Sequence, residues 1–494
     1  MPMAPESAEK KSFPHPGPII YRVGTLTYTK KALAILFLWL FWGDFCFVIM
    51  EGAIGGLMQL KFKALEAPNT TVGLFMATIP GVINMICNPV ISFKSDRCRS
   101  RWGRRIPFIL VTMPFLVACL YGLGFGDRIG FWLQHHIAAL GSRFSPAAVA
   151  IVVVGTIFAL FSFFNTFVNS VFWYLFNDVV PECLLARFMS WFRLISNGSV
   201  ALYSLFIFKH AETHLSGIFV GIGTLYLFGF GLMCLKIKEG EYPPPPENIG
   251  GKVGVIPEIK TYARECFCIP HYWYMFLVSM GVALAGSTSL FGLYFVQSLG
   301  LSYGMIGTLG FAGAVSSAIV MPITGWLADR YHPIRVVTGG LIAQLLVEPI
   351  GFIWLFWHPA PQTIFYVLGA ISVCLRAPIT SLVWVMDPPL FMRVFPRERF
   401  GQFGSANSMC RSLAGMVGGL LVGIYLDVLT THFGQKTAYC LLPFWSTTFY
   451  MLTLFCMLKF YRSWKRHGGD DSYVAPLSAQ PGEAIHIPAI VQEV

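Results

Sequence analysis

Long apolar stretches dominate the chain and alternate with short polar connections. A helix needs about 20 mainly apolar residues to cross the hydrocarbon core of a bilayer. Twelve stretches that reach this length cover residues 32–60, 71–93, 106–126, 147–176, 188–208, 215–235, 270–297, 303–327, 334–357, 362–386, 402–428 and 438–458. The pattern predicts an all-α polytopic membrane protein with twelve transmembrane helices.

A polar, proline-rich connection divides these stretches into six and six. We expect an N-terminal segment, a six-helix half, a linker, a second six-helix half and a tail over residues 1–31, 32–235, 236–269, 270–458 and 459–494. The halves share a repeat, because NPVISFKSDR from Asn88 and MPITGWLADR from Met321 align a proline, an aromatic residue and Asp-Arg. Repeated halves joined by a polar loop resemble the major facilitator architecture.

The charges support this topology. Only 12% of the residues are charged, against about 25% in soluble domains. Most of the 35 Lys and Arg residues lie in the connections on the side of the two termini. This positive-inside bias places both termini in the cytoplasm and the helices in the cytoplasmic (inner) membrane. The net charge of +11 therefore indicates contact with anionic lipid headgroups rather than with nucleic acid.

The sequence also argues against an enzyme. It contains no nucleotide-binding glycine loop, no clustered metal ligands and no nucleophile–base motif. We therefore expect no metal site and no organic cofactor. The expected partners are the lipid bilayer and a small-molecule substrate, and a monomer is expected to be sufficient.

A short connection after the second stretch combines one acid with several arginines. Asp96, Arg97, Arg104 and Arg105 can form charge-assisted hydrogen bonds to neighbouring helix ends. The Asp-Arg pair recurs at Asp329 and Arg330. We interpret these residues as a conformational latch that holds one state and breaks in the other. The alternative is that the arginines only fix the topology of the loop.

Polar and charged residues inside the apolar stretches are functional candidates, because a charge in the membrane costs a few kcal/mol. The first stretch carries Asp44 and Glu51 on one helical face. Two further sets are spaced four residues apart, Asn84 with Asn88, and Asn165 with Asn169 and Trp173. The other candidates are Arg193, Glu348, Arg376 and Arg411.

These residue types suit a sugar. Carboxylates, amides and arginine bind hydroxyl groups, and an indole provides a surface for the apolar face of a sugar ring. The alternative for the asparagines is structural, since side-chain amides commonly join helices in membrane bundles. For Glu348 a structural role is an equally good interpretation.

One segment resembles a known family. NPVISFKSDRCRSRWGRRIPF, from Asn88 to Phe108, is similar to the signature of the glycoside–pentoside–hexuronide:cation symporters, which include melibiose permease. Its SDRCRSRWGRRIPF portion is also similar to plant sucrose:proton symporters. The resemblance implies that Asp44 is a sugar-binding aspartate, that Trp173 stacks on the sugar, and that Arg193 stands near a functional arginine of the fifth helix.

The chain departs from this family at the coupling acids. The positions that carry acids in the cation-coupled relatives are Asn84, Asn88 and Asn169 here, and Ser162 takes the place of the proton-coupling aspartate of the sucrose symporters. A sodium site needs anionic oxygens, so Na⁺ is the weaker candidate. Coupling by H⁺ would then require Asp44 or Glu51, with Asn84 and Asn88 as neighbouring candidates.

The sequence thus predicts a sugar or glycoside permease that works by alternating access. The leading mechanism is proton-coupled import, with Asp44, Asn165, Asn169, Trp173 and Arg193 in the substrate site. An uncoupled facilitator and a non-transporting sugar-sensing receptor of the same fold are the alternatives.

Overall fold

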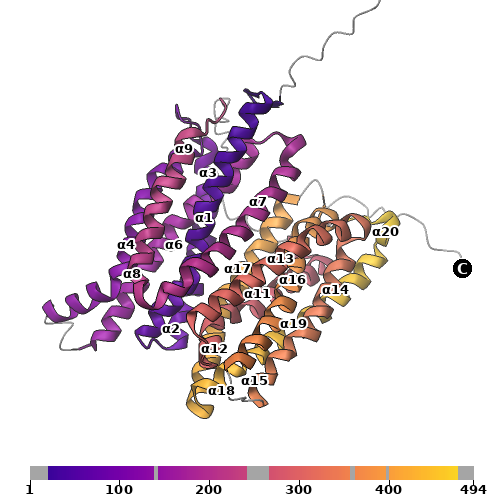
Figure 1. Cartoon of the computed structure of the whole chain (residues 1–494). Coiled ribbons are helices and arrows are strands. Elements are labelled where there is room, and N and C mark those ends of the chain that lie inside the picture. The colour runs from indigo at the N-terminus through magenta and orange to yellow at the C-terminus, as the bar shows by residue number, and fades with distance from the viewer. Residues whose placement is uncertain (1–20, 138–142, 242–265, 357–361, 397–399, 477–494) are drawn as a thin grey trace, which may run out of the picture.

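The computed structural model describes residues 21–137, 143–241, 266–356, 362–396 and 400–476. Most of the expected linker and both chain ends lie outside these ranges. Figure 1 shows helices from the first part of the chain beside helices from the second part. We call them the N-group (α1 to α9) and the C-group (α11 to α20).

Helices account for nearly all of the described structure. The N-group contains α1 (Lys30–Ala64), α2 (Asn69–Gly73), η1 (Leu74–Thr78), α3 (Ile79–Arg97), α4 (Ile106–His136), α6 (Pro146–Val179), α7 (Glu182–Leu202), η2 (Tyr203–Ile207), η3 (Phe208–His210), α8 (Ala211–Leu225), η4 (Tyr226–Phe230) and α9 (Gly231–Lys236). Before α1, a small antiparallel hairpin pairs β1 (Tyr21–Val23) with β2 (Leu26–Tyr28).

The C-group repeats the arrangement of long, locally irregular helices. It contains α11 (Pro270–Gly286), η5 (Ser287–Phe291), α12 (Gly292–Ser298), α13 (Tyr303–Arg330), α14 (Pro333–Val347), η6 (Glu348–Phe352), α15 (Ile353–Phe356), α16 (Gln362–Val394), α17 (Phe400–Phe433), α18 (Gln435–Cys440), α19 (Leu442–Arg466) and α20 (Gly469–Ser472).

The predicted transmembrane helices are confirmed. Eleven described helical stretches are long and apolar enough to cross a membrane, and ten of them coincide with single predicted spans. The eleventh, Phe188–Lys236, covers the fifth and sixth spans together. The chain turns between these two spans at η3 and at His214, whose backbone is not helical. Twelve spans in an all-α fold therefore account for the structure.

The helix ends follow local chemistry. The hydroxyls of Thr29 and Ser145 accept hydrogen bonds from backbone N–H groups in the first turns of α1 and α6, as N-cap residues do. Helix α4, which corresponds to the third predicted stretch, extends past its predicted end at residue 126 to His136. There the Nζ atom of Lys61 donates to Oδ1 of Asp127 at 3.0 Å, so this end of α4 is fixed to α1.

Both termini of the helical bundle, the start of α1 and the end of α19, lie on one side, which we call the terminal side. The two groups are joined by hydrogen bonds at the opposite side. There the Tyr294 hydroxyl donates to the Gln59 carbonyl at 2.6 Å, and Asp427 of α17 binds the start of α2. This interface closes the opposite side in the conformation seen here.

Candidate functional site

A polar cavity of about 480 Å³ lies between α1, α3 and α6 in the N-group. The structure brings six of the predicted site residues together in its wall: Glu51, Asn84, Asn88, Asn165, Asn169 and Trp173. They come from three different spans. Polar residues that are widely separated in the sequence therefore meet around one space inside the helical bundle.

Glu51 is the acidic centre of this cavity. Its Oε1 atom accepts hydrogen bonds from Nδ2 of Asn165 at 3.1 Å and from Nδ2 of Asn169 at 3.4 Å. The two amides reach the same oxygen because they are one helical turn apart on α6. The Glu51 side chain is exposed to the cavity, and a carboxylate can accept about four hydrogen bonds. It can therefore bind a further donor, such as a ligand hydroxyl.

A second chain of hydrogen bonds in the cavity is uncharged. The Ser170 hydroxyl donates to Oδ1 of Asn88, and Nδ2 of Asn88 donates to Oδ1 of Asn84. By the resemblance described above, Asn84 and Asn88 occupy positions where the cation-coupled symporters carry acids. A wall of amides and a hydroxyl offers both donors and acceptors but none of the anionic oxygens that a sodium ion prefers.

Trp173 lines the cavity with its indole ring. Phe176 and Phe192 meet this ring edge-on, with centroids 5.7 and 5.5 Å away, and such packing fixes its orientation. The guanidinium carbon of Arg193 lies 5.5 Å from the ring centroid, within the range of a cation–π interaction. Trp173 is still 37% exposed, so the ring can contact a ligand.

Asp44 and Arg193 are not among the residues that line this cavity. Asp44 is 1% exposed, and its Oδ2 atom accepts a hydrogen bond from the Ser196 hydroxyl of α7 at 2.7 Å. Its Oδ1 atom has no hydrogen-bond partner among the residues that the structure describes. Asp44 thus lies where α1 contacts α7. Arg193 contacts the cavity only indirectly, by its interaction with the Trp173 ring.

The cavity also contains hydroxyl-bearing residues that were not among the predicted site residues, although Ser162 was compared with the proton-coupling aspartate of the sucrose symporters. Ser162, Thr166, Ser170 and Tyr174 line it together with the asparagines. They form a second i, i+4 series on α6, next to the series from Asn165 to Trp173. This i, i+4 spacing could have predicted that the four residues share one face of α6. Hydroxyl residues are common in transmembrane helices, however, so their presence alone is weak evidence for a binding site.

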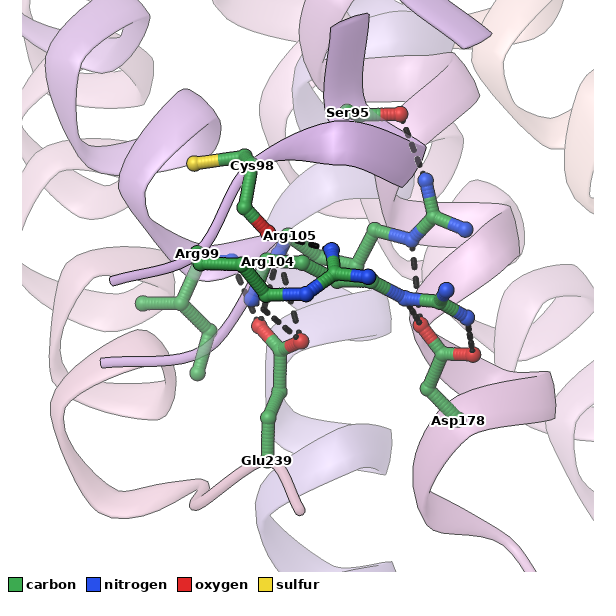
Figure 2. A network of polar contacts seen from close by, with 8 residues as sticks. Ser95, Cys98, Arg99, Arg104, Arg105, Asp178 and Glu239 are labelled. Atoms are coloured by element: carbon green, nitrogen blue, oxygen red, sulfur yellow. Dashed lines mark hydrogen bonds and ion pairs between the residues drawn. The ribbon is translucent and has the colours of Figure 1, made fainter. Parts of the chain in front are cut away.

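The arginines predicted to form a latch do bind neighbouring helix ends (Figure 2). Asp178, at the end of α6, accepts hydrogen bonds from Nε of Arg104 at 2.9 Å and from Nε of Arg105 at 3.0 Å. The Glu239 carboxylate, which follows α9, accepts from the backbone N–H groups of Arg104, Arg105 and Ile106 at 2.7–3.2 Å. It thereby caps the start of α4.

These bonds stay within the N-group. Arg105 also lies over the ring of Tyr174, with its guanidinium carbon 5.0 Å from the centroid, and Tyr174 lines the cavity. The side chains of Asp96, Arg97 and Asp329 lie outside the described residues. Arg330 is exposed and lies over the ring of Trp326. Whether this network breaks during a conformational cycle stays a prediction.

Comparisons with known proteins agree with this architecture. The sequence model of the Major Facilitator Superfamily matches residues 40–419. The sucrose transport protein SUT1 of Oryza sativa subsp. japonica is 31% identical over 94 residues, which are 17% of this chain and 18% of that protein. The matched stretch thus spans less than a fifth of this curated relative.

Solved structures show the same fold over most of the chain. A D-xylose-proton symporter superimposes with a TM-score of 0.63 at 12% identity, over 87% of this chain and 98% of that one. A mutant of the nucleoside transporter NupG superimposes with a TM-score of 0.61 at 13% identity, over 86% of this chain and 100% of that one. At these identities the likeness concerns the fold alone.

Proposed function

This chain belongs to the Major Facilitator Superfamily and is a membrane transporter, not an enzyme, and we propose that it carries a sugar or glycoside by alternating access. One observation carries the proposal. Glu51, held by Asn165 and Asn169, shares a cavity with the exposed indole of Trp173. A carboxylate and amides suit the hydroxyl groups of a sugar, and the indole suits the apolar face of its ring.

Similar proteins support a sugar as the cargo. Sucrose transport proteins of rice share a short stretch at about 30% identity, and a D-xylose-proton symporter shares the fold. Because the sequence match covers only about a fifth of each rice protein, sucrose itself is only the first sugar to test. The closed opposite side fits one end state of an alternating-access cycle.

We further propose that transport is coupled to H⁺ and proceeds as import. Glu51 is the charged side chain in the wall of the cavity, so it is the first candidate for the protonatable group, and the nearby buried carboxyl of Asp44 is the second. The neutral Asn84, Asn88 and Asn169 argue against Na⁺. The lack of acids at these three positions also supports a second candidate function, an uncoupled sugar facilitator.

The proposed orientation in the membrane follows from the distribution of Lys and Arg residues between the two sides. The terminal side, where basic residues concentrate, would face the cytoplasm of a cell whose inner membrane holds the protein. Import would then deliver the sugar to the terminal side. We also propose that a monomer is sufficient for transport.

Uptake of radiolabelled mono- and disaccharides into proteoliposomes tests the proposal, with and without an inward proton gradient. We expect saturable uptake of at least one sugar, accumulation driven by the gradient, and loss of that accumulation in Glu51→Gln while sugar exchange persists. Glu212→Gln, which changes an exposed carboxylate at the start of α8, is the matched control. Equilibration without accumulation would favour the facilitator, and binding without any uptake would favour a receptor.

A further inference from the structure

A second cavity, of about 610 Å³, lies between the two groups of helices. Asn197 and Val200 of α7 line it from the N-group, and its other lining residues belong to the C-group. Its charged residues are Glu348, at the start of η6, and Arg376, on α16. Neither residue lines the first cavity, so the site around Glu51 does not explain them.

The chain positions Glu348 by interrupting a helix. The α-helix α14 ends at Val347, and residue 349 is a proline, which lacks the N–H that would continue the α-helical hydrogen bonding. The chain continues as a 3₁₀-helix, and Glu348 is its first residue. The side chain is 1% exposed, and a buried charge without a partner is costly.

Three donors from three helices satisfy the Glu348 carboxylate. Nη2 of Arg376 donates to Oε1 at 2.8 Å, and Nε2 of Gln344 donates to Oε2 at 3.0 Å. The hydroxyl of Ser446, on α19, donates to Oε1 as well. Thr380 in turn donates to Oε1 of Gln344 at 3.3 Å. The carboxylate is therefore fixed and enclosed, and it is poorly placed to contact a ligand itself.

Arg376, unlike Glu348, is accessible from the cavity and has donors to spare. Its side chain is 36% exposed, and among the described residues the structure gives it one hydrogen bond, to Glu348. A guanidinium has five N–H donors, so several can point to a ligand. Trp354, Phe365 and Tyr450 add aromatic surface to the same cavity.

We propose that Arg376 is a ligand-contacting residue, and that its pairing with Glu348 makes this cavity select neutral polyhydroxylated cargo over acidic cargo. The inference rests on the proposed sugar transport and assigns it a contact from the C-group. N–H donors bind hydroxyl oxygens, while Glu348 cancels the positive charge that would otherwise attract a carboxylate ligand. Glu348 acts through Arg376 and is a positioning residue. Selection then depends on the Glu348 charge, which disfavours an acidic ligand, as well as on the Arg376 donors, which attract a neutral one.

Transport kinetics of three variants test this assignment. For the neutral sugar that the wild type takes up best, Arg376→Gln should raise KM about tenfold or more, because hydrogen bonds from a charged donor are lost. Glu348→Gln leaves Arg376 unpaired and should raise uptake of radiolabelled glucuronate, relative to the neutral sugar, by about tenfold. The double variant should lose this preference but keep the high KM. Arg335→Gln, which removes an exposed ion pair with Asp470, is the control.

Arg376→Lys guards against variants that fail to fold, because it keeps the charge but loses the planar fork of donors. It should give an intermediate KM. An unchanged KM in Arg376→Gln together with an unchanged glucuronate preference in Glu348→Gln overturns the inference and leaves the proposed function intact. Wild-type protein that takes up none of the sugars overturns the proposed function, and the inference with it.

Discussion

Replacing Asp427 by Asn should loosen the closed interface on the opposite side. The Oδ1 atom of Asp427 accepts hydrogen bonds from the backbone N and the Nδ2 of Asn69 at 2.9 and 2.8 Å. Its Oδ2 atom accepts from the backbone N and the hydroxyl of Thr70 at 2.8 and 2.6 Å. One carboxylate of the C-group thus holds the start of α2 in the N-group, and all four bonds must break when this side opens.

The size of the effect follows from these four bonds. A buried hydrogen bond to a charged group contributes about 1.5–3 kcal/mol, but Asp427 is only half-buried, so solvent reduces this value. We assign about 0.5–1 kcal/mol to each. Asn keeps one acceptor oxygen and loses the charge, so about 1–3 kcal/mol should be lost. This shifts the equilibrium toward opening by roughly 5- to 150-fold.

Hydrogen–deuterium exchange of the protein in nanodiscs measures the shift directly. The backbone amides of Asn69 and Thr70 are themselves donors to Asp427, so a peptide that covers α2 and η1 should exchange faster in the variant. Gly419→Ala should also speed exchange of this peptide, without any change in charge. Its added Cβ would lie 2.2 Å from the Cβ of Ala77 in η1, and this clash would push the two groups apart. Glu212→Gln is the control. Exchange that is equal in wild type and Asp427→Asn would refute the reasoning.

Three further predictions concern the cavity and the terminal side. Trp173→Ala should weaken sugar binding about tenfold or more, because a stacking surface is lost, and an unchanged affinity in a radioligand binding assay would remove the stacking assignment. Asp178→Asn should lower the thermal unfolding temperature, since Arg104 and Arg105 lose a carboxylate that accepts their hydrogen bonds; an unchanged temperature would contradict a structural role. Burial and the charges of Arg393 and Arg335 lower the pKa of His332 to about 4, so its contribution to stability is present above pH 6.5 and is lost as the pH falls toward 4. His332→Asn should flatten the pH dependence of unfolding over that interval, and an equal slope in both proteins would exclude His332 as its source.

The fold was predictable because its main signal is local. A span reveals itself by its own length and apolarity, so the sequence identified all twelve without information on contacts. The site was partly predictable for a similar reason. Polar residues at i, i+4 spacing on α6, such as Asn165 and Asn169, share a face in any helix, and the structure places both beside Glu51.

The remaining features depend on packing between distant segments. Asp44 and Glu51 share a face of α1, but seven residues separate them by about 10 Å along the helix axis. Asp44 therefore meets Ser196 of α7 instead of the cavity. The contact between Asp427 and the start of α2 joins residues more than 350 positions apart. Before folding, both are ordinary polar residues at the ends of apolar stretches.

One helical segment connects the closed interface to the cavity proposed as the sugar site. The segment formed by α2, η1 and α3 carries Asn69 at the interface and Asn84 in the cavity. Between them lies the π-helical η1, at Leu74–Thr78, and local π-helical turns are common at functional sites. Opening the interface must move the start of this segment relative to α17. We therefore expect η1 to absorb part of that movement and the rest to reach Asn84, which would change the cavity when the opposite side opens.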